Sequence, residues 1–420
     1  EYTDAKSQKN MHRNVIFRNE RVTDRAISIY DTGTCNFPKL WSMLRSECIE
    51  GDEGCDVLII PHNPNLSAGL MFRDPVTPKE AEERLFFEPV VELIQHKGAS
   101  ECRFDKLLGR GLNTEDELCD FEQIDADNLN MLGSVHGERR TERANIVPLD
   151  EFANRNMVRN VLKDGLAIGK EDGINPFRMG FIGSTDTHSA TPGAAEEDNY
   201  VGHLGKRDSE YRNVQDHFFA NPGGLAVVWS EENSRDAIFK GIRHRETYAT
   251  SGTRPTVRLF AGENLDENLC SSPDGIARAY KQGVPMGSEI RGGRTVSRMR
   301  LLVSAQKDVG IEGRPGTDLQ RIQIIKGWVD NEGSIHESIV DAVGDANNGA
   351  TVDPNTCMPV GVGSAQLCKV WEDPSFDPTQ DAFYYLRVLE NPSCRWSTLQ
   401  CQSAGVNPFS PSCKEQALVA

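Results

Sequence analysis

An Asp-x-His pair, Asp186 and His188, directly follows a short apolar run in this sequence. The run, residues 179–183, has the composition of a buried strand. Side chains two apart in a strand-like segment point to the same side, so the carboxylate and the imidazole are expected to face one point. A hard oxygen beside an imidazole nitrogen suits a first-row metal ion. The pair therefore predicts a metal site at the end of a strand.

Two more histidines stand where apolar runs end. His62 follows the run at residues 56–60, and His96 follows the run at residues 90–94. In strand–helix barrels and open α/β sheets, active sites assemble at this end of the strands. A single histidine there is more often structural, but three of them favour metal binding. His12, two positions before another expected strand, is a weaker candidate.

The segments that carry these residues alternate short apolar runs with helical patterns, which is typical of strand–helix repeats. Thr77-Pro78 followed by Glu80 predicts a capped helix start, and Ser234 predicts another. Strands are expected at residues 14–17, 56–60, 90–94 and 179–183, and a helix over 151–169. Residues 1–254 are therefore interpreted as one α/β domain.

The pattern changes after residue 254. Strand-like runs separated by long Gly-, Asp- and Pro-rich loops replace the helical patterns. The expected strands are residues 256–260, 296–304, 322–325 and 382–388. We interpret residues 255–420 as a mostly antiparallel β domain.

Composition restricts the class of protein. A chain of 420 residues is long enough for two domains. Hydrophobic residues make up 38% and charged residues 26%, as in ordinary globular proteins. No apolar stretch approaches the roughly 20 residues that span a bilayer. The net charge of −17 disfavours nucleic acid and anionic membranes as partners, because both require a basic surface. The sequence gives no sign of the oligomeric state.

The cysteines indicate an oxidising compartment. There are 11, many of them in polar, loop-like segments, so several are interpreted as disulfide-bonded. Short-range candidates are Cys48–Cys55, Cys102–Cys119, Cys357–Cys368 and a pair among Cys394, Cys401 and Cys413. A zinc-binding cysteine cluster is the alternative, although no Cys-x-x-Cys occurs. A periplasmic or extracellular location is expected. The sequence starts at Glu1 with neither Met nor a leader peptide, as if inside a domain.

Four motifs carry a resemblance to a known family. They are Ile-Pro-His-Asn-Pro-Asn-Leu-Ser at 60–67, Gln-His-Lys-Gly-Ala-Ser-Glu-Cys at 95–102, Gly-Ser-Thr-Asp-Thr-His-Ser-Ala-Thr-Pro-Gly at 183–193 and Glu-Thr-Tyr-Ala-Thr-Ser-Gly-Thr-Arg at 246–254. The chain resembles, over essentially its whole length, a large uncharacterised bacterial family. That family is related to the polymerase-and-histidinol-phosphatase (PHP) metallohydrolases.

The resemblance implies a distorted (β/α)7 barrel with two or three divalent ions, Zn, Mn or Fe. Asp186 and His188 match the late Asp-x-His of PHP proteins, and His62 matches their last single His. His12 matches the His that follows the bridging Glu, and Glu1 matches that Glu. An early His-x-His and the next His are absent. The barrel is thus expected to be incomplete at its N-terminus, with this chain a fragment of a longer protein.

The implied activity is metal-dependent hydrolysis of a small anionic substrate, most simply a phosphoester. Such an ion lowers the pKa of bound water to near 7, and the hydroxide attacks phosphorus without a protein nucleophile. His96 and Lys97 are catalytic candidates at a strand end, Lys97 as the cation for an anionic transition state. Arg254 is a candidate anion clamp. The alternative for Lys97 is a solvent-exposed lysine without a role in catalysis. The alternative for Arg254 is an interdomain salt bridge.

Two other functions stay open on the sequence. The same metal chemistry serves sulfate esters, amides or lactones, because fold does not choose the bond. A secreted, non-catalytic binding or structural protein with a vestigial metal site is the third reading. The missing His-x-His and the large β-rich half favour it.

Overall fold

The chain was analysed as a computed structural model, which divides into two compact units. The first unit comprises residues 1–193 and 219–251, and the second comprises residues 194–218 and 252–420. Helices and strands are mixed along the chain, and several sheets are antiparallel, in agreement with the expected α/β class. The described residues are 1–2, 5–6, 9–124, 126, 147–205, 208, 221–291, 295–312, 315–408, 410 and 413.

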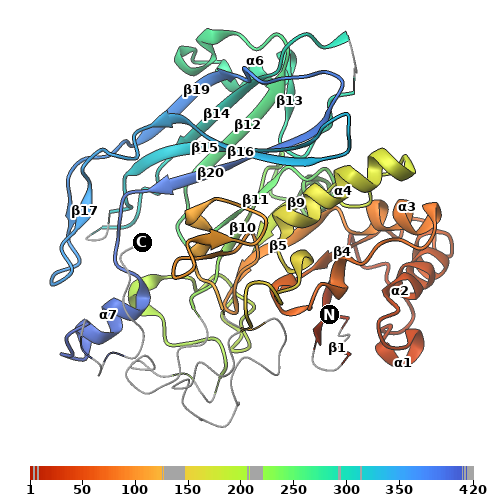
Figure 1. Cartoon of the computed structure of the whole chain (residues 1–420). Helices are drawn as coiled ribbons and strands as arrows, with labels where there is room; N and C mark the ends of the chain where they lie inside the picture. Colours follow the sequence, from red (N-terminus) through yellow and green to blue (C-terminus); the bar gives the residue numbers. More distant parts are fainter. Residues whose placement is uncertain are drawn as a thin grey trace. The chain divides into compact units, whose positions relative to one another are not determined.

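The first unit is built on a row of neighbouring strands (Figure 1). In spatial order they are β3 (Arg13–Phe17), β4 (Val57–Pro61), β5 (Val90–Gln95), β9 (Gly180–Gly183), β11 (Thr247–Thr250) and β10 (Leu225–Val228). β5 and β9 pair in parallel, whereas β3–β4 and β10–β11 pair antiparallel. Every residue of β4 is buried, as expected for a strand covered on both faces. Three of the four expected strands, β4, β5 and β9, therefore end near one another.

Short elements complete this sheet region. They are the strands β1 (Ala5–Lys6), β2 (Lys9–Asn10), β6 (Gly98–Ala99), β7 (Phe104–Asp105) and β8 (Arg110–Gly111), the helix α1 (Ile29–Thr32), and the π-helical turn Arg45–Ile49 that extends α2 (Phe37–Leu44). β6 pairs with β5 and continues the chain immediately after His96 and Lys97. The turn between β5 and β6 thus fixes the backbone positions of His96 and Lys97.

The two helices for which the sequence predicts caps begin at those caps, whereas a third expected helix begins later than predicted. Thr77 caps α3 (Pro78–Phe87) by accepting from the Glu80 amide, and Ser234 caps α5 (Arg235–Arg243). The Glu80 carboxylate accepts from Val76 rather than from Thr77, so the capping box is incomplete. The helix expected over 151–169 is α4, which begins only at Val158 and ends at Asp172.

An apolar cluster holds the site-bearing strands together. Phe239 and Ile242 of α5 pack on buried residues of three strands. Those residues are Leu58 and Ile60 of β4, Val90 of β5 and Ile182 of β9. Burying side chains of this size stabilises by about 1.5–3 kcal/mol each. The cluster therefore makes the relative placement of the strand ends rigid.

The second unit contains the antiparallel sheets β13–β12–β14–β19 and β16–β15–β20 (Figure 1) and the small antiparallel sheet β17–β18. Its main elements are β12 (Thr256–Gly262), α6 (Gly275–Gln282), β13 (Val284–Pro285), β14 (Arg300–Gln306), β15 (Leu319–Val329), β16 (Ile335–Gly344), β17 (Thr351–Val352), β18 (Pro359–Val360), β19 (Gln366–Glu372), β20 (Asp381–Glu390) and α7 (Trp396–Ser403). Leu301, Leu302 and Val303 are buried in succession. β14 is therefore covered on both faces.

Five disulfides form in the structure, which confirms the expectation of disulfide bonding. They are Cys48–Cys55, Cys102–Cys119, Cys270–Cys368, Cys357–Cys394 and Cys401–Cys413. The predicted pair Cys357–Cys368 is wrong, because each of these cysteines has a more distant partner. Cys368 lies in β19, and both Cys270 and Cys368 pack against one apolar cluster of the second unit. Within the described residues, no helix is both long and apolar enough to cross a membrane.

Candidate metal centre

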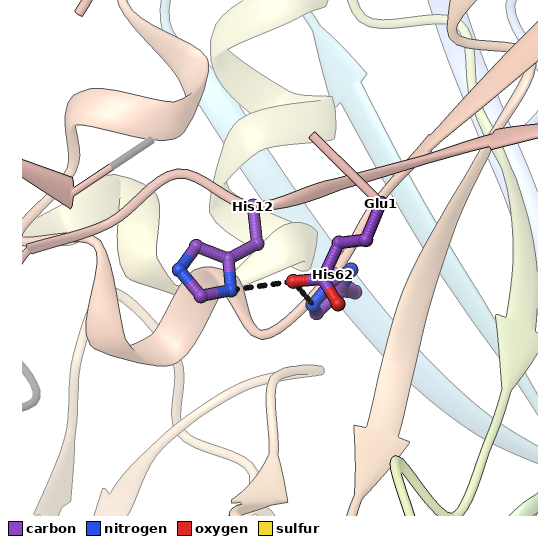
Figure 2. Close-up of side chains that lie close together, drawn as sticks. All are labelled: Glu1, His12 and His62. Atoms are coloured by element: carbon purple, nitrogen blue, oxygen red, sulfur yellow. Dashed lines mark ion pairs between the residues drawn. The ribbon is translucent and has the colours of Figure 1, made fainter. Parts of the chain in front are cut away.

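Glu1, His12 and His62 converge in the first unit (Figure 2). The Glu1 Oε1 atom lies 2.8 Å from His12 Nδ1 and 3.6 Å from His62 Nε2. One oxygen and two imidazole nitrogens thus lie within 4.8 Å of one another. The two rings meet edge to face, with centroids 5.6 Å apart. We call these three residues the first cluster.

Backbone pairing places the first cluster. Tyr2 and Arg13 form an antiparallel bridge, which brings the Glu1 side chain within reach of His12, the residue that precedes β3. His62 follows β4 directly, and its amide donates to the His12 carbonyl at 3.3 Å. The Asn10 side chain accepts from the His12 amide at 2.8 Å and holds the turn. The three side chains therefore come from adjacent backbones at one end of the β3–β4 pair.

The electrostatics of the first cluster favour a carboxylate and a neutral imidazole. The hydrogen bond from His12 holds the pKa of Glu1 below its usual value, although burial opposes this. Burial lowers the pKa of His62 to about 4, despite the nearby Asp186 and Glu1 charges. His62 Nδ1 is buried and has no hydrogen-bond partner among the described residues. A neutral imidazole with an available nitrogen lone pair is the form that binds metals.

A second cluster consists of His96, Asp186 and His188. Their ligand atoms also lie within 4.8 Å of one another. His96 Nε2 is 3.3 Å from Asp186 Oδ2, and the His96 and His188 rings have centroids 5.5 Å apart. His96 is fully buried, whereas His188 is exposed. The predicted Asp-x-His pair and one further strand-end histidine thus share one site.

Strand alternation is not what brings Asp186 and His188 together. β9 ends at Gly183, and Asp186 has the left-handed backbone angle φ = 49°. The segment is held by the His96 amide, which donates to the Thr185 carbonyl at 3.3 Å. Gly223 packs so closely that an added Cβ would lie 2.8 Å from the Ser184 carbonyl oxygen. A turn beside β5, rather than an extended strand, therefore positions the pair.

Lys97 is part of the second cluster. Its Nζ lies 2.8 Å from His96 Nε2 and also donates to Asp186 Oδ2. Gln95 Nε2 donates to the same Asp186 oxygen at 2.9 Å. Burial would raise the pKa of Asp186, but the hydrogen bonds and the positive charge around its carboxylate outweigh burial and lower the pKa. Asp186 is therefore an anion in this environment.

Four polar residues connect the two clusters, the buried Asn10, Asn63 and Glu92 and the half-buried Ser184, and sequence reasoning missed the central one, Glu92. Asn10 Nδ2 donates to the side-chain oxygen Oδ1 of Asn63 at 3.3 Å. The backbone N–H of Asn63 donates to Glu92 Oε1 at 3.2 Å. Ser184 donates to Glu92 Oε2. The available signal was a charged residue inside the apolar run at residues 90–94. Asn63 directly follows His62, so this chain of contacts runs from the first cluster to the turn before Asp186.

Two other groups of residues lie outside the clusters. Arg254 belongs to the second unit, where its guanidinium lies 3.2 Å from Glu196 Oε1. It is not in either cluster, and its role as an anion clamp stays a prediction. Cys102, Asp116 and Cys119 also lie together. Both sulfurs are already in a disulfide, so this group is not a metal site.

Fold and site together define a class of protein: an α/β unit with two histidine–carboxylate clusters at strand ends, and a second unit of antiparallel sheets. A family model described as "Protein of unknown function (DUF3604)" matches residues 1–417, and the chain belongs to that family. No curated protein and no solved structure matches the chain.

Proposed function

We propose that the protein is a metal-dependent hydrolase whose divalent ion is held by Glu1, His12 and His62. The arrangement of Glu1 Oε1 at 2.8 Å from His12 Nδ1 and 3.6 Å from His62 Nε2 carries this proposal. Two imidazoles and one carboxylate form the ligand set of many catalytic zinc sites, which keep a further position open. Manganese and iron accept the same donors.

The residues of the first cluster fit a divalent ion. Burial keeps His62 neutral, and its side chain is only 4% exposed. Glu1 is 42% exposed, so the ion would be reachable from solvent on the carboxylate side. The ion would supply a Lewis acid that activates water, so no protein nucleophile is required. His12 and His62 would orient the ion, and Glu1 would balance its charge.

A phosphoester is the substrate class that we propose, with a PHP-like distorted barrel as the fold. Both rest on the resemblance of the four motifs to proteins related to the PHP metallohydrolases. The row of neighbouring strands from β3 to β10 supports such a barrel. The ammonium of Lys97 gives the second cluster a cation suited to an anionic substrate. Five disulfides support a periplasmic or extracellular location.

Metal analysis tests the proposal. The wild-type protein is equilibrated with Mn²⁺ or Zn²⁺, and bound metal is measured for it, for His62→Ala and for His244→Ala. His244 is an exposed histidine after α5 and serves as the matched control. The His62→Ala change is expected to weaken binding by more than about a hundredfold, because even residues that only support ligands cost about 10–100-fold. Equal binding by all three proteins would refute the site.

A substrate panel then decides which bond is cleaved. Phosphomonoesters, phosphodiesters, sulfate esters, amides and lactones are offered to the metal-loaded protein. Phosphoester cleavage that falls with His62→Ala is expected. If the protein cleaves only one of the other substrate classes, it is still a hydrolase, but the proposed phosphoester substrate is wrong. Metal binding without any hydrolysis would favour a non-catalytic protein.

A further inference from the structure

The Lys97 ammonium uses the atoms of the second cluster that a metal ion would use. An ammonium has no acceptor lone pair, so Lys97 Nζ must donate to His96 Nε2 at 2.8 Å. That contact occupies the nitrogen lone pair of His96. The other contact of Lys97 is with Asp186 Oδ2. A metal ion bound by His96 Nε2 and Asp186 Oδ2 would need the lone pairs that these two contacts occupy.

The position of Lys97 is fixed by its surroundings. The Lys97 amide donates to Gln95 Oε1 at 2.7 Å, and Gln95 Nε2 donates to Asp186 Oδ2 at 2.9 Å. The Lys97 side chain is only 15% exposed. The Lys97 carbonyl accepts from Asn65 Nδ2 at 3.0 Å, which ties this turn to the segment after β4. A lysine held at both its backbone and its ammonium cannot leave the cluster by a simple rotation.

We propose that Lys97 is the resident cation of the second cluster, in place of a further metal ion, and that it binds an anionic oxygen of the substrate. The ammonium neutralises Asp186 and repels a divalent cation. Of its three N–H groups, two donate to His96 and Asp186, and the third has no partner among the described residues. This proposal rests on the metal-dependent hydrolase above, which would then hold its ion only in the first cluster.

The third N–H of Lys97 is suited to bind an oxyanion. A phosphoryl or similar oxyanion accepts from an ammonium through a short, charge-assisted hydrogen bond. The anionic group would lie beside the exposed His188 ring, on the open side of the cluster. The fully buried His96 lies behind the ammonium and holds it by accepting one N–H. Lys97 is thus a binding residue, and His96 and Asp186 are positioning residues.

Replacing Lys97 with Met tests this proposal, because Met keeps the length of the side chain and removes the charge. Bound Mn²⁺ is counted by equilibrium dialysis for wild type, Lys97→Met and the Lys97→Met/Asp186→Asn double variant. Lys79, exposed in α3, supplies the control Lys79→Met. Lys97→Met is expected to bind one ion more than wild type, and the double variant is expected to lose it. Inorganic phosphate should bind Lys97→Met about tenfold more weakly than wild type.

The outcomes separate this proposal from the proposed function. An ion lost in His62→Ala with no extra ion in Lys97→Met overturns the role of Lys97 and keeps the hydrolase. An extra ion in Lys97→Met, with no effect of His62→Ala, supports Lys97 and overturns the first cluster. No ion in any protein overturns both.

A measurement on the wild-type protein avoids the risk that Lys97→Met does not fold. Acylation of Lys97 is followed by mass spectrometry with and without saturating Mn²⁺. If Lys97 stays in the cluster, Mn²⁺ leaves its labelling unchanged, and Lys79 provides the fully reactive reference. Labelling that rises with Mn²⁺ would show that the ion displaces Lys97, and would overturn the proposal.

Discussion

Replacing Glu92 with Gln is expected to remove a large pH dependence from the stability of the first unit. Glu92 is 3% exposed in β5, and burial raises the pKa of its carboxyl to about 8. The Asp186 charge adds to this increase, whereas the Ser184 hydrogen bond opposes it. The folded protein therefore keeps a proton that the unfolded chain releases near its usual pKa of 4.5.

The sign and size of the effect follow from linkage. Because the folded pKa is raised, the contribution is most favourable below about pH 4.5 and is lost as the pH rises through about 8. At about 1.4 kcal/mol per pKa unit, the full loss is about 5 kcal/mol. Roughly 4 kcal/mol of this falls between about pH 5 and about pH 9. A whole domain is typically stable by only about 5–15 kcal/mol, so the effect is measurable.

Urea unfolding of the metal-free protein, in the presence of a chelator, measures this effect. The free energy of unfolding is compared for wild type, Glu92→Gln and Glu82→Gln at three pH values. Glu82 is exposed in α3 and serves as the control. The advantage of Glu92→Gln over wild type should grow by about 4 kcal/mol from about pH 5 to about pH 9. Parallel pH profiles for wild type and Glu92→Gln would show that Glu92 titrates normally and would refute the reasoning.

Two further predictions concern the disulfides and the turn before Asp186. Cys270 and Cys368 are 98 residues apart, so replacing both with Ser should cost the second unit about 4–5 kcal/mol; a loss below about 1 kcal/mol in urea unfolding would contradict this. Gly223→Ala should cost several kcal/mol, because Gly223 has φ = 79° and an added Cβ would lie 2.9 Å from the Thr185 Cα atom. Gly109 has φ = 62°, and no described atom lies within 4 Å of an added Cβ, so Gly109→Ala should cost only about 1–2 kcal/mol in the same urea unfolding assay.

The sequence was sufficient to predict the ends of the site-bearing strands. Each signal was local: an apolar run for β4, β5 and β9, followed by polar residues. Local proximity also predicted Cys48–Cys55 and Cys102–Cys119 correctly. The same reasoning failed for Cys357–Cys368, because Cys270, the partner of Cys368, lies in the distant 3-10 helix Glu267–Ser271, which packs on β19. Contacts between distant segments leave no trace in residue spacing.

The second cluster likewise depends on contacts between distant segments that the sequence does not reveal. Spacing alone indicated that Asp186 and His188 belong together, but for a reason that the structure does not support. Their turn depends on Gly223, which is 37 residues further along the chain and packs on the Ser184 carbonyl. The cation at Lys97 was visible in the sequence, but its contacts with His96 and Asp186 require the parallel pairing of β5 and β9. The tertiary fold decides these contacts.

Glu92 explains how the backbone of both clusters is held. Asn63 and Asp186 both have left-handed backbone angles, φ = 59° and φ = 49°, which cost energy in residues other than glycine. One carboxyl oxygen of Glu92 accepts from the backbone N–H of Asn63, and the other accepts from the Ser184 hydroxyl. One buried side chain thus restrains the residue after His62 and the turn that leads to Asp186. A change at Glu92 should therefore alter both clusters together, whereas a change at His62 or Lys97 alters only its own.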